Sequence, residues 1–106
     1  MKVKIGPYKK DNVRRKAKVE FIGEDFYSLY YTLGLVILPA LKEFKAKTPG
    51  YPGSLSSPEE WDEILDKMIY AFEHIINDSV DTTKTEYKKV QQGLNLFGKW
   101  YQALWY

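Results

Sequence analysis

Residues 33–41 form a run of nine positions, Leu-Gly-Leu-Val-Ile-Leu-Pro-Ala-Leu, that holds no charged and no hydrogen-bonding side chain. The run is well short of the ~20 apolar residues that cross a bilayer, so we expect no membrane span. A chain of 106 residues has the usual size of one domain, and we predict a single domain over residues 1–106. The run must therefore be covered by the remainder of a small chain or by a partner.

Apolar residues in and around this run recur three and four positions apart from Phe26 to Phe44, which predicts a helix over residues 25–47. Asp25 stands where an N-cap would satisfy the free amides of the first turn. Pro39 lies inside the helix, where it removes one backbone hydrogen bond and costs about 3 kcal/mol or produces a kink. The predicted helix thus contains one internal defect.

Apolar side chains also occupy the other sides of this helix, at Leu35, Val36 and Leu38. One small sheet and two further helices can hardly cover a helix that is apolar all round. The last ten residues of the chain add five aromatic side chains, which we interpret as a core or oligomer contact, or alternatively as a patch for a partner. We predict a homo-oligomer whose interface includes Leu35, Val36, Leu38, Trp100, Trp105 and Tyr106.

A second helix is predicted over residues 58–77. Ser57 followed by Pro58 and two glutamates is a strong start signal, because serine caps the first turn and proline is favoured at the first helical position. One apolar stripe follows, with acidic residues on the opposite side. The loop before it, residues 48–57, contains two prolines and two glycines, which rule out regular structure there.

A third helix is predicted over residues 84–105 from a further apolar stripe. Gly93 and Gly98 lie inside it, and each weakens a helix by about 1 kcal/mol relative to alanine. We therefore expect that another backbone comes close to these glycines or that the helix bends there.

The N-terminal part of the chain alternates with a period of two. Val3 and Ile5 alternate with lysines, and Val19 and Phe21 repeat the pattern, which predicts two antiparallel strands with these four side chains facing the core. Two strands alone are marginal in water. The predicted fold class is α+β, with an N-terminal antiparallel β-hairpin, the basic β-ribbon of residues 1–22, packed on a three-helix bundle.

The ribbon carries most of the positive charge. Residues 1–18 hold eight Lys and Arg against one Asp, a formal charge of +7, so the rest of the chain carries −5 within a net +2. These cations could bind phosphates while a tyrosine stacks on a base, or they could only guard an edge strand against pairing. The candidate ligand-binding surface, for a phosphate or an acidic partner, comprises Lys4, Tyr8, Lys9, Lys10, Arg14, Arg15, Lys16 and Lys18.

Candidate catalytic groups are scarce. His74 is the only histidine, and its neighbour Glu73 points about 100° away around a helix, so the two form no dyad. Acidic residues at the start of the second helix are typical of a solvated face. The chain contains no cysteine, no Gly-rich phosphate loop and no nucleophile motif. We predict no catalytic residue, no metal and no cofactor, and therefore a protein that is not an enzyme.

Four blocks of the sequence, in one order, resemble a family of uncharacterised proteins carried by tailed bacteriophages. They are residues 2–8, 32–42, 61–73 and 92–101. The chain departs from the family in being shorter than many relatives and in having Tyr30 and Tyr31 where relatives tend to have an Asp-His pair. The resemblance implies a phage origin and a location in the cytoplasm of the bacterial host, and it carries no established activity.

These observations lead to two main hypotheses and a third. The first is a phage-encoded, non-catalytic interaction protein, an oligomer that binds and inhibits or sequesters a host factor, such as one of a defence system. The second is a nucleotide or nucleic-acid binder that uses the basic ribbon, such as a sponge for a signalling nucleotide. The third is a component of the virion.

Overall fold

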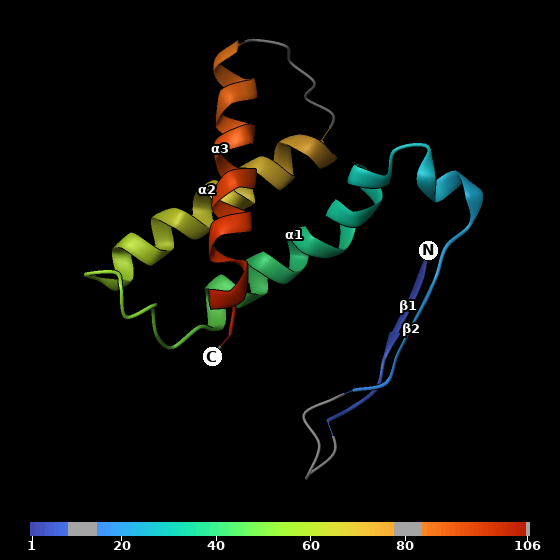
Figure 1. Cartoon of the computed structure of the whole chain (residues 1–106), viewed down its shortest axis with the longest axis horizontal. Coiled ribbons are helices and arrows are strands. Elements are labelled where there is room, and N and C mark those ends of the chain that lie inside the picture. The colour runs from blue at the N-terminus through green and yellow to red at the C-terminus, as the bar shows by residue number, and fades with distance from the viewer. Residues whose placement is uncertain (9–14, 78–83, 106) are drawn as a thin grey trace. The chain divides into compact units, whose positions relative to one another are not determined.

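The computed structural model describes residues 1–8, 15–77 and 84–105. Two strands are followed by three helices, which confirms the predicted α+β class (Figure 1). The elements in order are β1 (Lys2–Ile5), β2 (Ala17–Glu20), the 3₁₀ turn η1 (Gly23–Phe26), α1 (Leu29–Lys47), α2 (Pro58–Ile76), α3 (Lys84–Trp100) and the 3₁₀ turn η2 (Tyr101–Ala103). The chain forms two compact units, the hairpin unit (Met1–Thr32) and the helical unit (Leu33–Tyr106).

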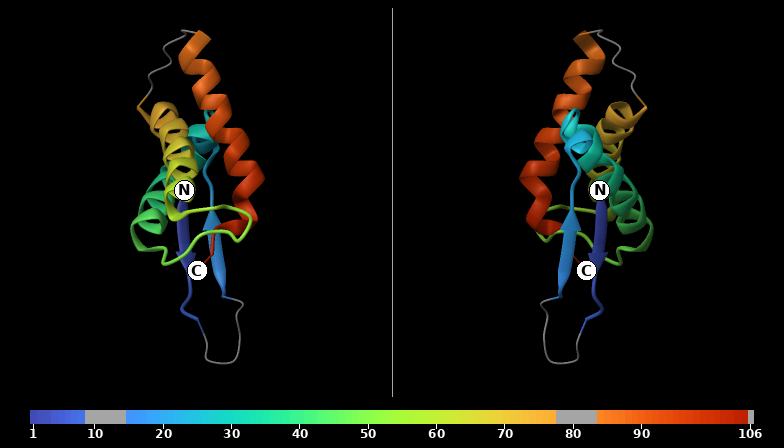
Figure 2. Two further views of the ribbon diagram at one scale, coloured as in Figure 1. Left: turned by 90° about the vertical axis from the view of Figure 1, so that its left-hand side faces the viewer. Right: turned by 90° about the vertical axis from the view of Figure 1, so that its right-hand side faces the viewer.

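The hairpin unit contains the predicted antiparallel pair, which Figure 2 shows as two adjacent arrows. Val3 is opposite Val19 and Lys4 is opposite Lys18. Because side chains alternate across a strand, this register places apolar residues on one face of the hairpin and charged residues on the other. The predicted alternation is therefore confirmed.

The expectation that the apolar face would be buried is wrong. The exposed fractions of Val3, Ile5, Val19 and Phe21 are 40%, 56%, 47% and 41%. A two-stranded sheet has no second layer of its own, so pairing the backbones leaves one apolar face open. The Phe21 ring, the one aromatic ring among these four side chains, contacts Phe26 at 5.6 Å between centroids.

The first helix begins at Leu29, four residues after the predicted start. The reason is Asp25, which was expected to cap this helix. Its carboxylate turns back instead, accepting a hydrogen bond from the amide of Ile22 at 2.9 Å and pairing with the amine of Met1 at 2.9 Å. These bonds close the 3₁₀ turn η1 before α1 can start. The Thr32 hydroxyl then donates to the Asp25 carbonyl at 2.9 Å, linking α1 to this turn.

The core lies in the helical unit and is built mainly by α2. Trp61, Leu65, Met68 and Phe72 are buried, together with Leu41 of α1. This is the apolar stripe that the sequence predicted for the second helix. The start signal is also confirmed, because the Ser57 hydroxyl accepts a hydrogen bond from the Glu60 amide at 3.2 Å.

The two glycines of α3 behave differently. A Cβ built on Gly93 would lie 2.3 Å from the Lys67 carbonyl oxygen and 2.5 Å from the Ala71 Cβ, whereas a Cβ on Gly98 would meet nothing within 4 Å. Gly93 is thus the point where α3 crosses α2 at backbone contact, which confirms the expected close approach at this glycine. The α-helix ends at Trp100, five residues before the predicted end, where the backbone tightens into η2.

Candidate functional site

The charged face of the hairpin brings three lysines together. Lys4 and Lys18 are paired across the strands, and Lys2 and Glu20 lie beside them on the same face, around a hollow of about 220 Å³. Of these three lysines, only Lys18 has a described carboxylate within ion-pair distance, that of Glu20 at 3.0 Å. Like charges directly opposite one another destabilise a strand pair. This face therefore has an excess of positive charge that an anion would offset.

A second basic group lies at the end of the strands. The Arg15 Nε donates to the Gly6 carbonyl at 2.6 Å, and its guanidinium stands 4.6 Å from the centroid of the Tyr8 ring. The Gly6 amide in turn donates to the Lys16 carbonyl at 2.7 Å. One face of Tyr8 is thus already covered by Arg15, so stacking on a base is restricted to the other face.

The predicted ligand surface is only partly described. Lys4 and Lys18 are brought together by the strand register, and Tyr8 and Arg15 by their own contact. The remaining described member, Lys16, is exposed. Three predicted members of this surface, Lys9, Lys10 and Arg14, lie outside the described residues. Tyr106 of the predicted interface also lies outside them.

One side of α1 exposes apolar residues of the run that the sequence singled out. Leu33 and Val36 form one stripe with Ala40, and Leu35 and Pro39 form an adjacent stripe. All five residues are exposed, with exposed fractions of 42% for Leu33, 45% for Leu35 and 44% for Val36. We refer to these five residues as the α1 outer face. Its helix is continuous through Pro39, which leaves the Leu35 carbonyl without its usual amide donor.

The residues of the predicted interface differ in their exposure. Leu35, Val36 and Trp105 are exposed, as an interface residue of the free chain must be. Leu38 and Trp100 are instead partly buried against the core cluster, and Trp100 contacts Trp61 edge to face at 5.8 Å. Leu38 lies one turn before the buried Leu41 on α1, and Trp100 is the last residue of α3. The interface itself stays a prediction.

Three ion pairs of the helical unit involve the C-terminal half of α1. Lys42 pairs with Glu73 at 2.9 Å, Lys45 with Asp66 at 2.6 Å, and Lys47 with Glu43 of the same helix. The hydrogen bond from Lys45 to Asp66 raises the pKa of the Lys45 ammonium. The first two pairs connect α1 to α2, and all three use α1 residues that follow the apolar run, so none of the five residues of the α1 outer face takes part in them.

The residues that could perform chemistry remain dispersed. The ring of His74 packs against Tyr70 at 4.8 Å between centroids. Within residues 1–8, 15–77 and 84–105, no three His, Asp or Glu side chains converge as a metal site would require. The helices in that part of the chain are also too short or too polar to cross a membrane.

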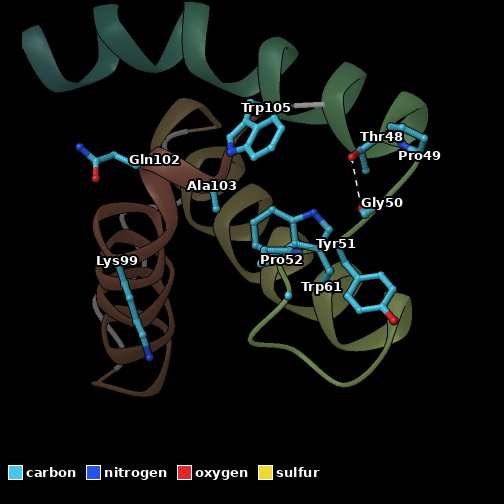
Figure 3. Close-up of a pocket in the computed structure, with 11 residues that line it drawn as sticks. Thr48, Pro49, Gly50, Tyr51, Pro52, Trp61, Lys99, Gln102, Ala103 and Trp105 are labelled. Atoms are coloured by element: carbon cyan, nitrogen blue, oxygen red, sulfur yellow. Dashed lines mark hydrogen bonds between the residues drawn. The ribbon is translucent and has the colours of Figure 1, made fainter.

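One feature was missed by sequence reasoning. A hollow of about 570 Å³ lies between the loop that follows α1, Trp61 of α2 and the C-terminal segment with Trp105 (Figure 3). We call it the aromatic hollow. The loop was interpreted only as irregular and the aromatic tail only as a contact surface. The signal that could have joined them was the ring-rich composition of both, with Pro49, Tyr51 and Pro52 in the loop.

Comparisons of the chain with protein-family models, with curated proteins and with solved structures found no match.

Proposed function

We propose that this chain is a non-catalytic interaction protein of a bacteriophage, which self-associates through the α1 outer face and, as an oligomer, binds and inhibits a factor of the bacterial host. The observation that carries the proposal is the exposure of Leu33, Leu35 and Val36 on one helix without a neighbouring charge. The phage setting and the host target rest on the family resemblance in the sequence.

The physical reason is the free-energy cost of leaving this apolar surface exposed to water. Burying apolar surface stabilises an assembly by roughly 25 cal/mol per Å², and contiguous apolar patches on monomers commonly mark interaction sites. Scattered exposed leucines need no explanation, but here two adjacent stripes of one helix are exposed together. A second copy of the same face would cover both at once in a two-fold arrangement.

The first test is the mass of the protein in solution, measured by sedimentation or light scattering. We expect an oligomer for the natural chain and a single chain for the double variant Leu35→Glu, Val36→Glu, because two carboxylates cannot be buried unpaired in an apolar contact. The matched control is Ala46→Glu, which adds a charge to an exposed position of the same helix outside the patch. A natural chain that sediments as one copy contradicts the proposal.

The second test concerns the host factor. A tagged natural chain and the double variant are exposed in parallel to bacterial lysate, and any host protein specific to the natural chain is purified and bound again from pure components. We expect one such protein whose activity falls on binding. Recovery of the chain alone, or of a protein whose activity is unchanged, contradicts the inhibitory role.

A second candidate function is favoured by the opposed Lys4 and Lys18, which concentrate charge on one hairpin face. In this alternative the chain binds a nucleotide or a single-stranded nucleic acid there. Binding should weaken as salt rises, with the logarithmic slope reduced by about 0.7 for each phosphate contact removed. Lys4→Glu with Lys18→Glu should abolish it, whereas Lys88→Glu with Lys89→Glu, which changes the net charge equally on α3, should not. An equal loss of binding in both double variants would mean that net charge, and not the hairpin face, determines binding.

A further inference from the structure

The aromatic hollow is independent of the surfaces used above. Eleven residues line it, all in the helical unit, and most of them are apolar or aromatic. Its volume of about 570 Å³ falls in the range typical of small-molecule sites, ~300 to 1,000 Å³. The hollow is therefore large enough for a ligand of two or three fused rings.

The floor of the hollow is held in place by the core. Trp61 is 2% exposed and its indole is fixed edge to face by Phe44 at 6.5 Å and by Trp100 at 5.8 Å. Because Trp61 is almost fully buried, it offers a ligand only the small part of its surface that lines the hollow. That part is preformed, which lowers the entropy cost of binding.

The walls come from two separate segments. On one side stands the loop, whose prolines limit its freedom and whose Leu55 amide donates to the Pro52 carbonyl at 2.9 Å. On the other side stands Trp105, which is 73% exposed and whose ring Figure 3 shows across from that of Trp61. A highly exposed indole costs free energy in water unless a ligand covers it.

The charged side chain among the described residues that line the hollow is a cation, Lys99. Among the described residues that line it, Lys99 is the only ionisable group apart from the phenol of Tyr51. Lys99 lies at the rim on α3, with its ammonium 5.4 Å from the Trp100 ring centroid. Its flexible stem allows the ammonium to meet an acidic group on a ligand at the rim.

We propose that the aromatic hollow is a binding site for a small planar aromatic acid, with the rings stacked on Trp105 above the buried Trp61 and the acidic group at Lys99. The exposed indole of Trp105 selects a flat ligand, because stacking is most favourable between π surfaces. A rim that carries a cation and no carboxylate selects an anion over a cation of the same shape.

The test uses three probes of one shape: 2-naphthoate, 2-naphthamide and 2-naphthylmethylammonium. Binding is followed in ¹⁵N-labelled full chain by the indole N–H signals of its three tryptophans. We expect saturable 1:1 binding of naphthoate that moves the Trp61 and Trp105 signals, weaker binding of the amide and the weakest binding of the cation. No saturable shift, or equal binding of all three probes, overturns the proposal.

Variants then locate the site. Trp105→Ala should weaken naphthoate at least about fivefold, through loss of one stacking surface, and Lys99→Met roughly threefold, through loss of one exposed ion pair. The matched controls are Tyr87→Ala and Lys88→Met, on α3 but away from the hollow, and they should bind as the natural chain does. Trp61 is left intact because its replacement would damage the core. Unchanged binding in Trp105→Ala overturns the proposal.

Discussion

The hairpin unit and the helical unit are stabilised in opposite ways. Of the described residues in Met1–Thr32, only Thr32 is buried, and the unit is closed by backbone pairing and by the bonds of Asp25. In Leu33–Tyr106, a cluster around Trp61 and Leu65 excludes water, while polar bonds cap a helix start and link α1 to α2 at the surface. The comparison teaches that alternating residues are enough to pair two strands, whereas a helical stripe becomes a core only when a second apolar face meets it.

The largest expected effect comes from Leu65, which is 0% exposed. Leu65→Ala should destabilise the protein by about 2 to 5 kcal/mol, because it leaves a cavity that helices cannot fill. Val19→Ala in the hairpin, which also removes apolar carbons, should change stability by less than about 1 kcal/mol because Val19 is already exposed. Urea unfolding measures both. Similar losses for the two variants would break the comparison.

Gly93 tests how closely α2 and α3 approach one another. Gly93→Ala should destabilise the chain by about 1 to 3 kcal/mol, since its methyl group would overlap the Lys67 carbonyl. The control is Gly98→Ala in the same helix, where nothing lies within 4 Å. This variant should be neutral or more stable by up to about 1 kcal/mol. Thermal unfolding separates the two, and a destabilised Gly98→Ala variant would contradict the assigned crossing point.

Ser57 tests a local bond of the helical unit. Ser57→Ala removes the oxygen that accepts from the Glu60 amide and should cost about 1 kcal/mol in urea unfolding. The control, Ser54→Ala, changes an exposed serine of the same loop and should remain within about 0.5 kcal/mol of the natural chain. A neutral Ser57→Ala would mean that the cap adds nothing to a helix already held by its core.

The smallest effect is expected at Asp25 and should be confined to the hairpin unit. Its pKa is lowered from the ordinary 3.8, first by the hydrogen bond from the Ile22 amide and then by the Met1 amine. Because the folded-state pKa is the lower one, the stabilisation is complete above the unfolded value and is lost as the pH falls through the folded value. The protection of the strand amides, measured against their intrinsic exchange rates at each pH, should therefore fall on acidification below about pH 3.8.

The variant Asp25→Asn should remove that acid dependence and speed hairpin exchange at neutral pH. Glu24→Gln, at the neighbouring exposed position, should do neither. If acid or Asp25→Asn loosens α2 as readily as the strands, the polar closure of the hairpin unit is not a local feature and the comparison fails.

Much of the local structure could be predicted because it depends on neighbours in the sequence. The Ser-Pro-Glu-Glu start of α2 and its single apolar stripe are local signals, and both are confirmed. The polar and apolar faces of the hairpin follow from a period of two, which the observed register preserves. The start of α1 was predicted wrongly because the Asp25 carboxylate could accept either from an amide in the first turn of the helix or from the Ile22 amide before it. Only the three-dimensional geometry decides between these two bonds.

Of the candidate surfaces, the exposed Leu35 and Val36 were predicted because a helix that is apolar all round must leave one side uncovered in a small chain. The aromatic hollow was not, because Tyr51, Trp61 and Trp105 are far apart in sequence and no periodicity connects them.

By itself, the sequence determined which segments are helices and strands and which face of each is apolar, since these depend on residues a few positions apart. Only the tertiary structure decided which apolar face is buried, that Gly93 is a crossing point while Gly98 is not, and that a loop and a tail enclose a hollow. Those outcomes depend on contacts between segments that are far apart in the sequence, and local periodicity does not specify such contacts.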